Sequence, residues 1–271
     1  MSWRAVARKD FLDATRSKML WGLLVVFIGY LGIVSYLSQG GDAELLEFIE
    51  LTAQGFVLFV PLVSIILGYK SIIDERESGT IALLLSLPHS RRDMVVGKFV
   101  GRTVVLAIPV LVSLLGASAV IVLLFDSFPV IDYVLFALLS VALGAAFLGI
   151  SVGLSMSTTV NRRVTAGAFG AYVVLGVLWK QIMDAMLVIL WRFENGVLVD
   201  RPAWAMFVQM ASPMESFDRL TAALFDLDIA TAYTAADAPW VVDAWVAVLV
   251  LVGWVVLPLG IGYIRFSIAD L

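Results

Sequence analysis

Residues 74–98 read DERESGTIALLLSLPHSRRDMVVGK, a charged segment between two long apolar runs. The segment holds four acidic residues, four Lys or Arg residues and the single His of the chain, around the apolar stretch 81–87. Gly79 and Pro88 bracket that stretch, and both residue types commonly end helices. About two helical turns between such breaks are too short to cross a membrane. The segment therefore predicts a short helix that lies across the two longer helices on either side.

The composition outside this segment is that of a membrane protein. The chain has 271 residues, of which 61% are hydrophobic and 15% are charged, whereas soluble domains average about 45–50% and about 25%. Runs of about 20 apolar residues can cross a bilayer as helices, so we expect an all-α polytopic membrane protein. The predicted spans are 19–37, 51–73, 99–125, 133–156, 164–190 and 241–264. The same pattern leaves a large outer loop at 191–240, and a re-entrant hairpin within 184–235 stays open.

The Lys and Arg residues indicate the orientation. Fourteen of them lie at the two ends of the chain, in the 70–102 region and after the fourth span, and the opposite loops hold only Arg192, Arg201 and Arg219. The positive-inside rule then places both termini and residues 74–98 in the cytoplasm, with the chain in the plasma membrane of the cell. The outer loops are acidic, and the chain has five Lys against thirteen Arg. This exterior suggests the hypothesis of a high-salt organism, because strong surface charge keeps proteins hydrated and soluble.

The first 18 residues predict an amphipathic helix on the membrane surface. Trp3, Ala7, Phe11 and Ala14 recur at helical spacing, with basic residues around them. Asp10 interrupts the apolar stripe. The alternative is a cytoplasmic tail that Trp3 alone anchors.

Several classes of chemistry are excluded by what the sequence lacks. There is no Cys, and therefore no disulfide or thiolate metal site. A nucleotide-binding P-loop needs Gly-Lys followed by Ser or Thr, whereas Gly97-Lys98 precedes Phe99. The single His89 excludes paired-His haem ligation and zinc protease motifs. We therefore expect no catalytic residue, metal or cofactor on this chain, and no nucleic-acid partner.

Polar and small residues within the spans are the next candidates. Lys180 and Asp184 lie four apart on one helix face and could form an intramembrane polar pair; the alternative is that they reach the membrane surface separately. Two G-x-x-x-G patterns, at 97–101 and 149–153, allow helices to approach closely. We expect both patterns to pack helices within the chain rather than to form a dimer seam.

The charged segment resembles the signature that follows the second span of type-2 ABC transporter permeases. The residues that carry the resemblance are Glu75, Glu77, Gly79, Thr80, Ile81, Leu84, Leu85, Pro88, Ser90, Arg91 and Lys98. The six spans, the surface helix and the large last loop fit the same class. Within it, the chain looks most like single-domain permeases that include the membrane subunit of the nitrous-oxide-reductase maturation transporter. Residues 212–217, SPMESF, resemble a serine-proline element in the last loop of these permeases.

The resemblance implies how the chain would work. The short helix would be a coupling helix that docks on a separate ABC ATPase, which would hold ATP and Mg. Two ATPases would serve two permease copies, either identical or close paralogues, surrounded by membrane lipid. The last outer loop would fold back as an outer gate that includes Ser212, Pro213 and Glu215.

Three functions follow from these patterns. The first is the membrane subunit of an ATP-driven ABC transporter, an exporter. The second is an ATPase-coupled subunit that acts mechanically on an extracytoplasmic partner without moving a solute. The third, a stand-alone secondary transporter, would require charges deep in the spans or an internal repeat, and the sequence shows neither.

Overall fold

The computed structural model describes residues 3–15, 18–38, 45–77, 90–124, 128–193, 195–235 and 238–268. The described residues form helices and connecting turns without a strand. Five helical stretches are long and apolar enough to cross a membrane, and a bent pair makes a sixth candidate. This architecture confirms the predicted all-α polytopic fold.

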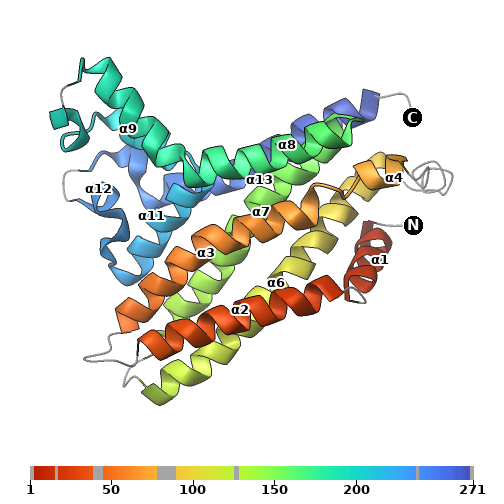
Figure 1. Ribbon diagram of the computed structural model, residues 1–271, viewed down its shortest axis with the longest axis horizontal. Helices are drawn as coiled ribbons and strands as arrows, with labels where there is room; N and C mark the ends of the chain where they lie inside the picture. The colour runs from red at the N-terminus through yellow and green to blue at the C-terminus, as the bar shows by residue number, and fades with distance from the viewer. Residues whose placement is uncertain are drawn as a thin grey trace.

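The long helices lie side by side along one direction (Figure 1). They are α2 (Lys18–Leu37), α3 (Leu45–Gly68), α6 (Arg91–Leu124), α7 (Val130–Ser157) and α13 (Ala244–Ile268). The short α1 (Trp3–Thr15), α4 (Ile73–Glu77) and the last turns of α13 share one end of the bundle, called here the terminal end. The opposite, far end carries α9 (Trp179–Leu190), α10 (Ala203–Met210), α11 (Pro213–Phe225) and α12 (Thr231–Thr234). Short 3-10 turns at Asn195–Leu198, Asp228–Ala230 and Trp240–Val242 connect these elements.

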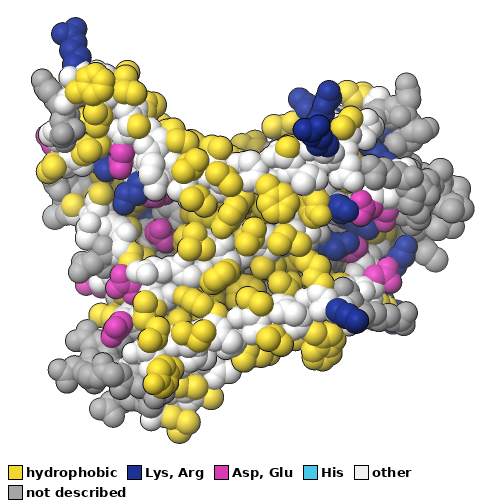
Figure 2. All heavy atoms as spheres, viewed as in Figure 1, with side chains coloured by type: hydrophobic (Ala, Val, Ile, Leu, Met, Phe, Trp, Pro, Cys, Tyr) yellow, Lys and Arg dark blue, Asp and Glu magenta, His cyan; other side chains and the backbone are white. Residues whose placement is uncertain are grey.

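The middle of the bundle is apolar, and its charges lie toward the two ends (Figure 2). A row of buried rings crosses it: Phe27 of α2 meets Phe56 of α3 edge-on at 5.6 Å, and Phe56 stacks on Phe136 of α7 at 6.0 Å. Phe217 of α11 continues the row at 5.9 Å from Phe136. Such ring pairs add to the packing that holds helices together in lipid. The row ties the far-end helix α11 to the centre of the bundle.

The two G-x-x-x-G patterns pack helices within the chain, as predicted. A Cβ on Gly97 would lie 2.6 Å from the Cβ of Val6, and one on Gly101 would lie 3.1 Å from the carbonyl oxygen of Ala7. These two glycines therefore seat α1 on α6. Gly149 lies against the backbone of α13, where an added Cβ would be 3.0 Å from the Trp254 carbonyl, and Gly153 faces the same helix.

The predicted span 164–190 is not one straight helix. It consists of α8 (Asn161–Tyr172), a π-helical turn (Val173–Val177) and α9, with a bend of 64°. The Leu178 amide donates to the Val173 carbonyl, five residues back, at 2.8 Å. Gly176 leaves room for the end of the Met214 side chain of α11. The apolar run predicted the length of this segment, but its bend depends on α11, which is distant in sequence.

Candidate functional site

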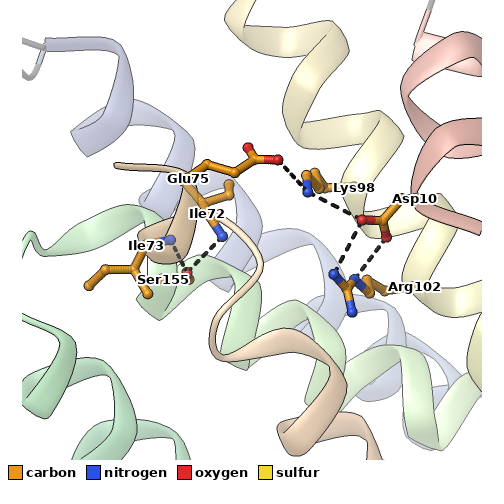
Figure 3. A network of polar contacts seen from close by, with 7 residues as sticks. All are labelled: Asp10, Ile72, Ile73, Glu75, Lys98, Arg102 and Ser155. Carbon is orange, nitrogen blue, oxygen red and sulfur yellow. Dashed lines mark hydrogen bonds and ion pairs between the residues drawn. The ribbon is translucent and has the colours of Figure 1, made fainter. Parts of the chain in front are cut away.

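The predicted coupling segment starts where the chain leaves α3. A turn at residues 69–72 leads into α4, and the amides of Ile72 and Ile73 both donate to the Ser155 hydroxyl of α7 at 3.1 Å (Figure 3). Ser155 is fully buried. Because one hydroxyl holds two successive backbone amides, the start of α4 is fixed to the central helix of the bundle.

Four charged side chains meet beside this turn, in a cluster called here the terminal network: Asp10, Glu75, Lys98 and Arg102 (Figure 3). The Lys98 ammonium lies 2.6 Å from the Glu75 carboxylate and 3.2 Å from the Asp10 carboxylate. Arg102 grips Asp10 with two nitrogens, at 2.8 and 3.2 Å. The network contains two acids and two bases, so its formal charges balance. Buried charges persist only when they are paired in this way.

The terminal network joins three elements that are distant in sequence. Asp10 comes from α1, Glu75 from α4, and Lys98 and Arg102 from successive turns of α6. Asp10 is the buried residue of α1, with 6% of its surface exposed. In the sequence Asp10 only interrupted an apolar stripe; the structure shows that it faces α6 with that stripe. Whether α1 also lies on a membrane surface stays a prediction.

The network includes two residues that the sequence analysis did not select as site residues, Asp10 and Arg102. A signal was available, because Lys98 and Arg102 are four residues apart and share one face of α6 with Gly97 and Gly101. Two basic residues beside glycines that let another helix approach closely suggest that this other helix carries an acidic side chain. The pairing across about 90 residues of chain could not be read from local patterns.

The exit of the coupling segment is fixed as well. Ser90 caps α6, since its hydroxyl accepts from the Asp93 amide at 3.0 Å and the Asp93 carboxylate accepts in return from the Ser90 amide at 3.4 Å. Such reciprocal capping stabilises a helix start. The same carboxylate accepts from the Trp3 amide, the first of α1, at 3.3 Å. The start of α6 is therefore tied to the start of α1.

Arg91 connects this exit to α13. One guanidinium nitrogen donates to the carbonyls of Phe266 and Ser267 at 2.6 and 2.9 Å. Arg76 of α4 and Arg91 both lie over the Phe266 ring, at 5.0 and 5.5 Å from its centre. Cations at the carbonyl end of a helix are favourable. Both ends of the coupling segment thus contact the last turns of α13.

The predicted coupling residues divide into two groups. Glu75, Ser90, Arg91 and Lys98 occupy the two ends of the segment, in the contacts described above, and Glu77 ends α4. The remaining six lie outside the described residues: Gly79, Thr80, Ile81, Leu84, Leu85 and Pro88. The described ends are held by α1, α7 and α13, so a force on the segment between them would reach all three helices.

At the far end, α10 and α11 fold back on each other at Ser212. Its hydroxyl donates to the Leu175 carbonyl at 2.7 Å and accepts from the Met214 amide at 3.2 Å, with Pro213 in the first turn of α11. A π-helical turn leaves carbonyls without their usual partners, and Leu175 lies in that turn. The Ser212 side chain therefore caps α11 and also provides a hydrogen-bond donor for the Leu175 carbonyl at the bend of the fifth span.

The carbonyls that end α10 are also satisfied by side chains. The Trp179 ring nitrogen donates to Gln209 at 2.9 Å, Ser216 to Met210 at 2.6 Å, and the Trp254 ring nitrogen to Ala211 at 2.7 Å. A backbone reversal in an apolar setting requires such partners, because unsatisfied carbonyls there cost several kcal/mol. The reversal formed by α10 and α11, called here the far-end hairpin, is therefore an ordered structure rather than an open loop.

Glu215 lies inside this hairpin. Its carboxylate accepts from the Tyr233 hydroxyl at 2.7 Å and from the Gln209 amide at 3.3 Å. The neighbouring Asp218 is half-buried; burial, with Glu215 adding and Lys180 opposing, raises its pKa to about 8. This end of the protein thus carries a carboxyl group that titrates near neutral pH.

The predicted pair of Lys180 and Asp184 is not formed. Asp184 instead pairs with Arg201 at 3.0 Å, and Arg201 also contacts Gln209. Lys180 is exposed. Spacing along α9 favoured Lys180, but the loop before α10 brings the Arg201 guanidinium to the same carboxylate. Arg201 therefore links α9 to the far-end hairpin.

These clusters are contacts that join helices. Within the described ranges, no group of three or more His, Cys, Asp or Glu residues could hold a metal ion. The terminal network is a charge-balanced joint between helices, and the far-end hairpin is a capped reversal. Both arrangements hold helices together.

Comparison with known proteins agrees with this architecture. A permease described as probable ABC transporter permease protein NosY, from Stutzerimonas stutzeri, is 28% identical over 194 residues, which cover 68% of this chain and 70% of the relative. The protein of the same description from Pseudomonas aeruginosa is 27% identical over 197 residues, with the same coverage. The family model of the ABC-2 family transporter protein matches residues 4–271. The chain therefore belongs to the ABC-2 transporter family and is a membrane subunit of an ABC transporter.

Proposed function

We propose that ATP hydrolysis on a separate ABC ATPase drives this subunit through residues 74–98, and that the transporter is an exporter. The observation that carries the proposal is the terminal network with the contacts of Arg91. These contacts join the two ends of the segment to α1, α7 and α13. A docked segment without such contacts would move alone, whereas this one would move the bundle.

In the proposed unit, two permease copies work with two ATPases, and the ATPases hold ATP and Mg. Both termini and residues 74–98 face the cytoplasm, as the placement of Lys and Arg indicates. The paired rings Trp191–Trp204 and Trp240–Trp245 at the far end would lie at the opposite membrane surface, where Trp is enriched. The hairpin of Ser212, Pro213 and Glu215 would gate the outer end of the pathway.

The coupling step is tested by ATPase activity of the assembled complex in lipid vesicles. Lys98→Met should lower ATP hydrolysis several-fold while the ATPase stays bound, because the docked segment loses its link to α1. Lys9→Met is the matched control, since Lys9 is an exposed lysine of α1. Equal hydrolysis in wild type and Lys98→Met would contradict the proposal.

Orientation is tested with single cysteines, because the chain contains none. A cysteine at Ser86 and one at Ala236 should react with an impermeant thiol reagent from opposite sides of the membrane. Reaction from one side only would contradict the proposed topology.

A second function, mechanical action on an extracytoplasmic partner, is favoured by one observation. The segment between α9 and α10 exposes large apolar side chains, with Phe193 75% and Val199 91% exposed. Such surfaces often mark contacts with other proteins or membrane. Cross-linking from a cysteine at Val199 to a second protein, without export of any solute, would favour this function over transport.

A further inference from the structure

A long apolar groove lies between α8 and α13. It has a volume of about 1120 Å³, with α7 as its floor. Phe207 and Ala211 of α10 and the 3-10 turn at Trp240 line it toward the far end. Among its lining side chains only Ser157 and Arg265 carry hydroxyl or charged groups. Typical ligand pockets have volumes of about 300–1,000 Å³, so this groove is slightly larger. It also lacks the polar side chains that would orient a compact ligand.

The groove is long and apolar enough to hold an extended acyl chain, which reaches about half of the hydrocarbon thickness of a bilayer. Both Trp245 and Arg265 of α13 line it, and twenty residues of helix rise about 30 Å. This is about the thickness of the hydrocarbon layer of a bilayer. Other parts of the protein leave the groove uncovered. Only 17% of the most apolar window of α13 is buried inside the protein, against 61% of the corresponding window of α3.

Positive charge is concentrated at the terminal end of the groove. Arg162 and Arg163 lie in the first turn of α8, Arg265 lies in the last turn of α13, and all three are exposed. No described acidic side chain forms an ion pair with any of them. The start of α8 is also the positive end of the helix dipole, which adds partial positive charge there. Lys and Arg side chains stand out over this end of α8 in Figure 2.

We propose that the groove binds an anionic phospholipid, with an acyl chain along α13 and the phosphate among Arg162, Arg163 and Arg265. The apolar lining would hold the acyl chain of the lipid, and the three guanidinium groups would select an anionic headgroup. The proposal does not depend on the ATPase or on the direction of transport.

The charges argue for lipid rather than a second copy of this chain. Two copies related by a two-fold axis along the membrane normal would place equivalent residues at the same depth. Contact along the groove would then bring two clusters of three arginines together, and like charges in an interface are unfavourable. An anionic lipid neutralises the same charges.

The test is native mass spectrometry of the full chain in detergent with added phosphatidylglycerol or phosphatidylcholine. Gly170 and Gly253 line the groove, and an added Cβ at either meets nothing within 4 Å. Gly170→Leu with Gly253→Leu should therefore obstruct the groove, since the Cβ atom has room at both positions. Gly29→Leu on α2 is the matched control, since an added Cβ there also meets nothing. The charge variant replaces Arg162, Arg163 and Arg265 by Gln, and its control replaces Arg4, Arg8 and Lys9 of α1 by Gln.

We expect wild type and both controls to retain phosphatidylglycerol, and the groove-filling pair to lose it. Each arginine near an anionic headgroup is worth about a fivefold preference, so the charge variant should lose a preference over phosphatidylcholine of roughly a hundredfold. Unchanged retention in the groove-filling pair would overturn the proposal, as would equal loss in Gly29→Leu or in the α1 charge control. If the groove-filling pair no longer self-associates but still binds phosphatidylglycerol, the groove is the contact surface for a second copy instead.

Discussion

Replacing Lys98 by Met should destabilise the protein strongly, because Lys98 is the centre of the terminal network. Its side chain is 10% exposed and contacts Asp10 and Glu75, whose side chains are 5% and 16% exposed. Breaking a buried ion pair by removing one partner costs about 3–5 kcal/mol, since the other charge stays buried. Arg102 still neutralises Asp10, so the lower figure of about 3 kcal/mol applies.

That loss should appear in thermal unfolding followed by Trp fluorescence in detergent. For a chain of this size, each kcal/mol shifts Tm by about 2–4 °C, so the expected decrease is about 6–12 °C. The control Lys9→Met should change Tm by less than about 2 °C, because the side chain is exposed. Glu75→Gln in the Lys98→Met background should restore part of the loss, since it removes the buried carboxylate that has lost its cation. A Tm for Lys98→Met equal to that of Lys9→Met would refute the account of the network.

Ser212→Ala should destabilise the far-end hairpin by about 2 kcal/mol, from a lost helix cap and an unsatisfied Leu175 carbonyl; limited proteolysis should then cut near α10, whereas Ser118→Ala, which loses only a local bond, should resist as wild type does. Because the pKa of Asp218 is raised to about 8, the folded state binds more protons than the unfolded state, and stability should fall as pH rises from about 4 to about 8. Asp218→Asn should reduce that slope of Tm against pH, and an unchanged slope would assign it to other groups. If the acidic exterior reflects a high-salt environment, Tm should rise steeply between dilute buffer and molar KCl; no dependence on salt would exclude that origin.

The sequence predicted the helices well and their contacts poorly, for a physical reason. Long apolar runs determine a membrane helix, because every backbone group must be bonded within the lipid. Hence α2, α3, α6, α7 and α13 overlap the expected spans. The bend at Leu178 depends on Ser212 and Met214, more than 30 residues away, and no pattern within the run announces it.

The candidate site shows the same division. The coupling segment stands out by its charge, its Gly and Pro breaks and its resemblance to known permeases. Asp10 looked like a flaw in an apolar stripe because its partners, Lys98 and Arg102, lie about 90 residues away. Of the two alternatives for Lys180 and Asp184, the mutual pair is not formed: Asp184 pairs with Arg201, a cation from another segment that spacing on one helix cannot reveal.

The proposed coupling requires an ATPase that docks at residues 74–98, and co-purification measures this docking directly. The protein should be isolated in mild detergent, with an affinity tag, as wild type, as Leu84→Asp and as Leu12→Asp, where Leu12 is exposed on α1 outside the coupling segment. An ABC ATPase should co-purify with wild type and with Leu12→Asp and be lost from Leu84→Asp. An ATPase that stays bound to Leu84→Asp, or that binds none of the three, would contradict docking at residues 74–98.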